Sequence, residues 1–111
     1  MQIETQHQGA VTVIKPHGPL NVDEIESMRE ALREAIGTSL GRFVIDLTEV
    51  PFIDSAGLEL LLDTTDQLDQ SGQTLHLCGA MDTLREVFDI TEVGSHFDLF
   101  EDTTTAVRSF L

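Results

Sequence analysis

Residues 46–58 read DLTEVPFIDSAGL, and they join a buried strand to the start of an amphipathic helix. The strand at 43–47 is nearly all apolar and β-branched, which is typical of a strand covered on both faces. Apolar residues then recur at helical spacing from Leu58 to Leu68. A buried strand that leads into an amphipathic helix favours an α/β layer fold.

Upstream of this stretch the sequence predicts a hairpin. The β-branched residues at 11–14 predict a strand that ends at Lys15-Pro16-His17-Gly18-Pro19, because two prolines and a glycine stop a strand and turn the chain. A short strand near Ile3 is expected to pair with it across Gly9.

A first helix is expected between the hairpin and the buried strand, since apolar residues recur at helical spacing from Val22 to Ile36. Asn21 followed by Glu24 matches a capping box, and Gly37 is the predicted stop at the C-terminal end.

Downstream, strands and helices continue to alternate. A strand is predicted at 74–78, a helix capped by Asp82, an edge strand at 97–100 and a last helix opened by Asp102. We therefore predict one domain over residues 1–111, with a mixed, mostly parallel sheet of four to five strands flanked by about four helices.

The composition restricts the class of partner. The chain of 111 residues has 6 Lys and Arg against 20 Asp and Glu, a formal net charge of -14. Such a surface repels the phosphates of nucleic acids and anionic lipids, so we expect neither nucleic acid nor membrane as a partner. The single Cys78 excludes an internal disulfide, and the first residues lack the pattern of a secretory signal; we expect a cytoplasmic protein.

Ser55 occupies the most informative position in the opening stretch. Asp54 has a good N-cap side chain, so Ser55 is expected to be the first residue of the helix, near free backbone N–H groups and the positive end of the helix dipole. That position favours a phosphate. Gly57 leaves out a side chain beside the serine, which we interpret as permitting close approach of another protein's backbone.

Several motifs along the chain, taken together, resemble one known family, the STAS domains, and in particular the bacterial anti-sigma-factor antagonists. The resemblance covers essentially the whole chain. The motifs that carry it are Gly18-Pro19-Leu20, Asp46-Leu47, the segment FIDSAGL at 52–58, Gly72, Cys78-Gly79, and FDLF at 97–100 leading to Ala106.

The resemblance implies a partner switch. The unphosphorylated antagonist binds a serine-kinase anti-sigma factor and releases the sigma factor, phosphorylation of Ser55 ends the binding, and a PP2C-type phosphatase resets the switch. Ala56 stands where many members have a second serine, so Ser55 is the only hydroxyl of the motif. The implied partner surface comprises Asn21, Asp23, Asp54, Gly57, Leu58 and Glu59. The chain has no Gly-rich phosphate loop, so we expect neither catalysis nor a cofactor. The sequence leaves a monomer and a weak dimer both open.

Other functions stay open on the sequence. STAS domains also serve as scaffolds and as small cytosolic subunits of lipid-transport ABC systems. An enzyme is less favoured, because His7, His17, His76 and His96 lie at no metal-ligand spacing and Cys78 has no base near it in sequence. We expect Cys78 to be buried and His76 to point to the face of the sheet opposite that of Leu75 and Leu77.

A phospho-aspartate receiver built on Asp46 is disfavoured, because its lysine belongs late in the chain and the only lysine is Lys15. Asp46 is expected to bond the loop that follows its strand.

Overall fold

The structure is a computed structural model that describes residues 1–111. Its centre is a five-stranded sheet in the order β1-β2-β3-β4-β5. The strands are β1 (Gln2–Gln8), β2 (Val11–His17), β3 (Phe43–Asp46), β4 (Leu75–Cys78) and β5 (Phe97–Phe100). β1 runs antiparallel to β2, and all other neighbours are parallel, which confirms the predicted mixed sheet.

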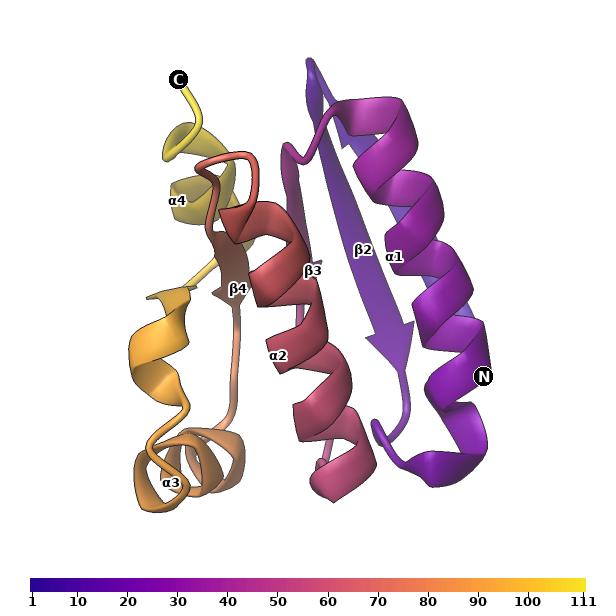
Figure 1. The fold of residues 1–111 in the computed structure, drawn as a ribbon, viewed down its shortest axis with the longest axis vertical. Coiled ribbons are helices and arrows are strands. Elements are labelled where there is room, and N and C mark those ends of the chain that lie inside the picture. The colour runs from indigo at the N-terminus through magenta and orange to yellow at the C-terminus, as the bar shows by residue number, and fades with distance from the viewer.

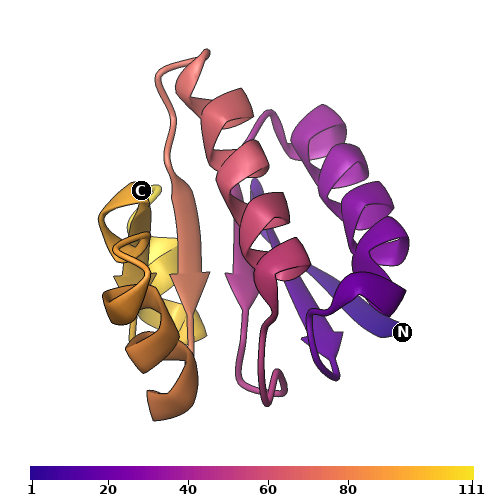
Figure 2. The ribbon, with the colours of Figure 1, turned by 60° about the horizontal axis from the view of Figure 1, so that its bottom comes forward.

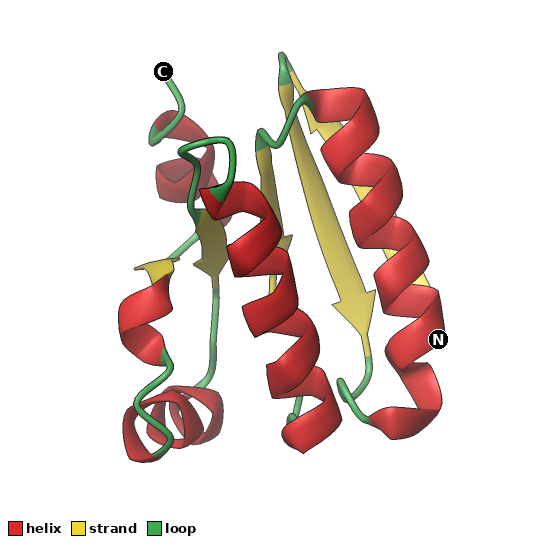
Figure 3. Cartoon of the chain, viewed as in Figure 1, coloured by secondary structure: helices red, strands yellow, loops and turns green.

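Four α-helices connect and cover the strands: α1 (Ile25–Ser39), α2 (Ser55–Asp69), α3 (Asp82–Ile90) and α4 (Thr103–Arg108). Short 3₁₀ turns occupy Val22–Glu24 and Gly94–His96. The helices α1 and α2 lie side by side on one face of the sheet, and α4 lies on the opposite face (Figures 1 and 2). Helices and strands alternate after the first hairpin (Figure 3), as the sequence predicts.

Alternating side chains of the strands build a separate core on each face. Ile14, Ile45 and Leu77 point into the larger core, which is closed by α1, α2 and α3. The smaller core under α4 consists of Val11, Val44, Cys78 and Ala106. Because strand residues point alternately to the two faces, a parallel strand covered on both sides must be apolar throughout, as β3 is.

The second strand of the hairpin includes a proline. β2 continues through Pro16 to His17, which lies inside the segment 15–19 where the sequence predicts its end. A proline is tolerated here because β2 pairs with β3 only at residues 12–14, so no hydrogen bond is required from Pro16 on that side.

The predicted boundaries were wrong at the end of α1 and at the N-cap of α3. α1 runs past Gly37 to Ser39, and the chain leaves it through Leu40 and Gly41, both with positive φ (56° and 83°). Asp82 is the first residue of α3, and the N-cap is Met81, which makes no side-chain cap bond. Asp102 does cap α4, since its side chain accepts from the backbone N–H of Thr105 at 2.8 Å.

None of the helices has both the length and the apolar character that crossing a membrane demands.

The position of Gly37 inside α1 gives a stability prediction. Gly37→Ala should raise the free energy of unfolding by about 0.5–1 kcal/mol, because alanine favours the helix interior and a Cβ at this position meets nothing within 4 Å. Gly41→Ala is the matched control and should destabilise, because Gly41 has a positive φ and its Cβ would meet the Gln73 side chain. Urea unfolding of the two variants checks this; a loss of stability in Gly37→Ala would contradict the helical assignment.

Candidate functional site

Two loops lie side by side at the carboxyl end of the parallel strands. One is residues 18–22, after β2, and the other is residues 49–54, before α2. Backbone hydrogen bonds join them: Gly18 N–H to the Glu49 carbonyl (3.0 Å), Leu20 N–H to the Phe52 carbonyl (3.1 Å) and Asp54 N–H to the Leu20 carbonyl (3.1 Å). The loops therefore form one connected surface, although they are about thirty residues apart in sequence.

Asp54 holds both loops with one carboxylate. Its Oδ1 accepts the backbone N–H of Gly57 at 3.0 Å, which caps α2 as the sequence predicted. Its Oδ2 accepts the backbone N–H of Val22 at 3.0 Å, at the start of the 3₁₀ turn that leads into α1. The Gly57 N–H, with a smaller contribution from Val22, lowers the pKa of Asp54 against the opposing effect of desolvation. The carboxylate is thus held in its ionised form.

Gly57 packs closely against other residues of the same chain. It is buried, and a Cβ at this position would lie 2.4 Å from the Leu20 carbonyl oxygen and 2.6 Å from Cγ1 of Ile53. The interpretation that Gly57 admits another protein's backbone was wrong, because the backbone that approaches it is that of Leu20. Gly57 lies beneath the surface next to Ser55 and supports it.

Ser55 is the first residue of α2, as the sequence predicts, and its side chain is exposed. The first backbone N–H groups of a helix have no partner within the helix, and they carry the positive end of its dipole. A phosphate on Ser55 would therefore lie where a helix of 15 residues tolerates negative charge.

The capping box predicted at the other loop is absent. Asn21 has an extended backbone and makes no side-chain cap bond, and its Oδ1 is buried without a hydrogen-bond partner. Glu24 instead lies 2.9 Å from the α-amino group of Met1. The start of the 3₁₀ turn is held by Asp54, from a different segment of the chain.

The structure brings the other predicted partner residues to this end of the molecule. Asp23 and Glu59 are exposed, and Leu58 is partly buried. Glu59 follows Ser55 by four positions, so the two share one face of α2.

Sequence reasoning missed two apolar residues of this surface. Val22, at which the predicted apolar pattern of the first helix begins, is 68% exposed, and Phe52 is 52% exposed. The available signal for Phe52 was its position in a loop directly after Pro51. We name Val22, Phe52, Ser55 and Glu59 the switch surface.

The groups that an enzyme would need do not converge elsewhere. Cys78 is fully buried, as predicted, and burial raises the pKa of its thiol to about 11, so the reactive thiolate is disfavoured. His76 points away from Leu75 and Leu77, as expected, and stacks on Phe110 with ring centroids 4.1 Å apart. No three His, Cys, Asp or Glu side chains are grouped so as to hold a metal ion.

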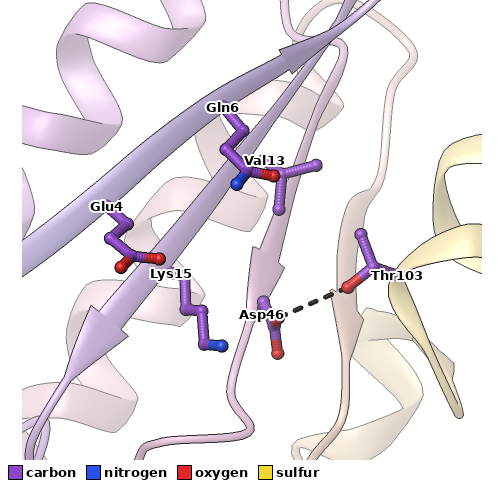
Figure 4. Close-up of a pocket in the computed structure, with 6 residues that line it drawn as sticks. All are labelled: Glu4, Gln6, Val13, Lys15, Asp46 and Thr103. Atoms are coloured by element: carbon purple, nitrogen blue, oxygen red, sulfur yellow. Dashed lines mark hydrogen bonds between the residues drawn. The ribbon is translucent and has the colours of Figure 1, made fainter.

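Asp46 and Lys15 line one small pocket on the α4 face of the sheet (Figure 4). Asp46 is engaged on both oxygens. Its Oδ1 accepts the backbone N–H of Thr48 at 3.0 Å and the Thr48 hydroxyl, and its Oδ2 accepts the Thr103 hydroxyl at 3.3 Å. Asp46 thus bonds the loop that follows β3, as the sequence suggested, and the residue is buried. This arrangement favours a structural role over that of a phosphate acceptor.

Comparison with known proteins identifies the family. The STAS domain family model matches residues 2–106. The anti-sigma-B factor antagonist of Staphylococcus aureus is 29% identical over 91 residues, which are 82% of this chain and 84% of the relative. BtrV of Bordetella bronchiseptica, which carries the name of an anti-sigma factor antagonist, is 31% identical over 93 residues, 84% of this chain and 80% of BtrV.

Solved structures share the fold. An anti-sigma factor antagonist from Mycobacterium paratuberculosis superposes with a TM-score of 0.85 at 20% identity, over 97% of this chain and 92% of that one. The Bacillus cell fate determinant SpoIIAA, in its phosphorylated form, gives a TM-score of 0.72 at 20% identity, over 99% and 100% of the two chains. The chain belongs to the STAS domain family, and the resemblance inferred from the sequence is confirmed.

The close contact at Gly57 gives a second stability prediction. Gly57→Ala should lower the free energy of unfolding by about 1–3 kcal/mol, because the added methyl group would overlap backbone and a packed side chain. The neighbouring Ser55→Ala, at an exposed position, should change it by less than about 0.5 kcal/mol. Urea denaturation compares the two; equal stabilities would contradict the packing role of Gly57.

The lowered pKa of Asp54 gives a pH prediction. The stabilisation by its carboxylate should be complete above the usual carboxyl value of 3.8 and should be lost as the pH falls through the lower pKa of the folded state. Asp54→Asn keeps a capping oxygen but removes the charge, so wild type should be the more stable at neutral pH. The difference should shrink as the pH falls below 3.8. Unfolding by urea at neutral and at acidic pH measures it; a difference that grows in acid would contradict the assignment.

Proposed function

We propose that this protein is an anti-sigma-factor antagonist whose unphosphorylated form binds a serine-kinase anti-sigma factor and releases the sigma factor. The proposal assigns the switch to Ser55 and assigns no catalytic step to the chain. The observation that carries it is the exposed Ser55 at the first position of α2, beside a loop that Asp54 holds in place. The names of the relatives support the same functional class.

Phosphorylation at this position would change charge more than structure. A phosphate adds about 1.5 to 2 negative charges, and the N-terminus of α2 accommodates them. The exposed neighbours Asp23 and Glu59 are already acidic, so the added charge concentrates the negative potential on the switch surface. A partner fitted to the unmodified surface would then meet a repulsive and more strongly hydrated group, which weakens the complex.

The switch surface also indicates the chemistry of the partner. Val22 and Phe52 offer apolar side chains for burial, and acidic residues surround them. We propose a partner surface with an apolar depression and a basic rim, because such a rim complements a chain of net charge -14 and speeds association. The kinase supplies its own nucleotide, so this chain requires no cofactor. A PP2C-type phosphatase would return Ser55 to its free form, and the whole cycle is placed in the cytoplasm.

The test compares Ser55→Ala, Ser55→Asp and wild type as baits in a lysate of the source organism with Mg-ATP. Wild type and Ser55→Ala should retain a serine-kinase anti-sigma factor, and Ser55→Asp should bind the purified kinase at least about tenfold more weakly. Ser71→Asp is the matched control, because Ser71 is exposed beyond the opposite end of α2 and the change adds the same charge. Mass spectrometry of wild type after the reaction should find phosphate on Ser55.

The alternatives give different results in the same experiment. Equal binding by all variants, or no phosphate on Ser55, would overturn the switch and leave Ser55 as an ordinary first residue of a helix. Capture of ABC-transporter subunits alone would favour the transport role, and retention of other STAS proteins in a large assembly would favour a scaffold.

A further inference from the structure

The edge strand β1 is open to solvent along its whole length. It spans seven residues, of which six are exposed and only Ile3 is partly buried. β2 is its only neighbour in the sheet, and β1 forms the outer border of that sheet (Figure 2). An exposed edge of this length offers a row of unpaired backbone groups to another strand.

One backbone hydrogen bond fixes which residues offer those groups. The backbone N–H of Thr12 donates to the carbonyl of Arg42 at 3.0 Å, so Thr12 directs its backbone toward the β3 side. Thr12 lies opposite His7 in the hairpin. Because the Thr12 N–H bonds to Arg42, Thr12 and His7 form a non-hydrogen-bonded pair. The N–H and C=O of His7 therefore point to the free edge of the sheet. By alternation, Thr5 and Ile3 do the same.

β1 lacks the features that protect edge strands. It contains no proline, lysine or bulge, and Glu4 and His7 are its only acidic or basic side chains. The opposite edge, β5, is shorter, with four residues, and Asp98 lies within it while Glu101 and Asp102 follow it. Of the two edges, β1 is the one suited to pairing.

The distribution of charge favours a second copy of this chain as the partner of β1. Residues 1–22 contain one acidic side chain, Glu4, and one lysine, Lys15, whereas the chain as a whole carries a net charge of -14. The hairpin is therefore a region in which two copies of this acidic protein approach with little repulsion. A basic partner strand would gain little from an edge that is nearly neutral.

We propose that two copies of the chain associate through β1, antiparallel about a twofold axis at Thr5, to form one continuous sheet. This register places Thr5 opposite Thr5 of the second copy and Ile3 opposite its His7, which pairs all the outward backbone groups. Glu4 faces Gln6 of the second copy, so no like charges stand opposite one another. Cross-strand Thr–Thr pairs and a carboxylate next to an amide are favourable neighbours.

The dimer leaves the switch surface free. The switch surface lies at the carboxyl end of the parallel strands, and β1 lies at a lateral edge. Because the twofold axis reverses the strand direction, the two copies of Ser55 would face opposite ends of the joined sheet. This inference is independent of the proposed function, since the pairing uses no residue of the switch surface.

The association should have a characteristic salt dependence. Each copy carries a net charge of -14, so the acidic parts of the two copies outside the nearly neutral contact repel each other. Salt screens this repulsion over distances longer than about 10 Å at 0.1 M ionic strength. The dimer should therefore become tighter as salt is added, whereas a contact based on ion pairs would become weaker.

Sedimentation velocity over a range of protein concentrations tests the proposal, at low and at high salt. Thr5→Pro should weaken the dimer at least about tenfold, because it removes an outward N–H without removing a bond to β2. Thr5→Glu keeps the backbone donor but places two carboxylates opposite one another at the twofold axis, and it should also weaken the dimer. Gln70→Glu is the control, since it adds the same charge at an exposed site beyond α2, and it should dimerise like wild type.

Amide hydrogen exchange locates the contact and guards against variants that fail to fold. In wild type, the amides of Ile3, Thr5 and His7 should exchange more slowly as protein concentration rises, while that of Leu99 in β5 should not change. A monomer at every concentration and salt would overturn the proposal. A dimer that persists in a folded Thr5→Pro variant, or whose protection appears only at β5, would overturn it as well.

Discussion

The carboxylate of Asp54 is the interaction on which the functional end of the molecule depends. One oxygen caps α2 through Gly57, and the other binds Val22, 32 positions earlier in the chain. Because a carboxylate is planar and rigid, these two bonds fix the start of α2 relative to the loop that follows β2. Backbone donors lower the pKa of Asp54, so the ionised form that makes both bonds persists to a lower pH than that of an ordinary aspartate.

This arrangement produces a preformed surface. The Leu20 carbonyl lies against Gly57 so closely that no side chain fits between them, and backbone hydrogen bonds join the rest of the two loops. A partner therefore has little ordering entropy to overcome when it binds here. A phosphate on Ser55 would act on a surface that is already fixed, so the expected effect is electrostatic and local.

The sheet separates the switch surface from the edge strand β1. Its carboxyl end carries Ser55 among acidic and apolar neighbours, and its lateral border is the polar, nearly neutral strand β1. Acidic residues are spread over the rest of the chain, where they oppose non-specific association. The placement of the two surfaces follows from topology: parallel strands bring loops after β2 and β3 together, and the antiparallel hairpin leaves β1 outermost.

The sequence by itself determined what depends on neighbours along the chain. Alternating strands and helices, Ser55 at the start of α2 and the opposite orientation of His76 all follow from periodicity and capping, which act over a few residues. The tertiary structure decided the rest. It extended α1 through Gly37, exposed Val22 and turned Gly57 toward Leu20. These outcomes depend on atoms that are distant in sequence and become neighbours only when the sheet forms, so no local pattern encodes them.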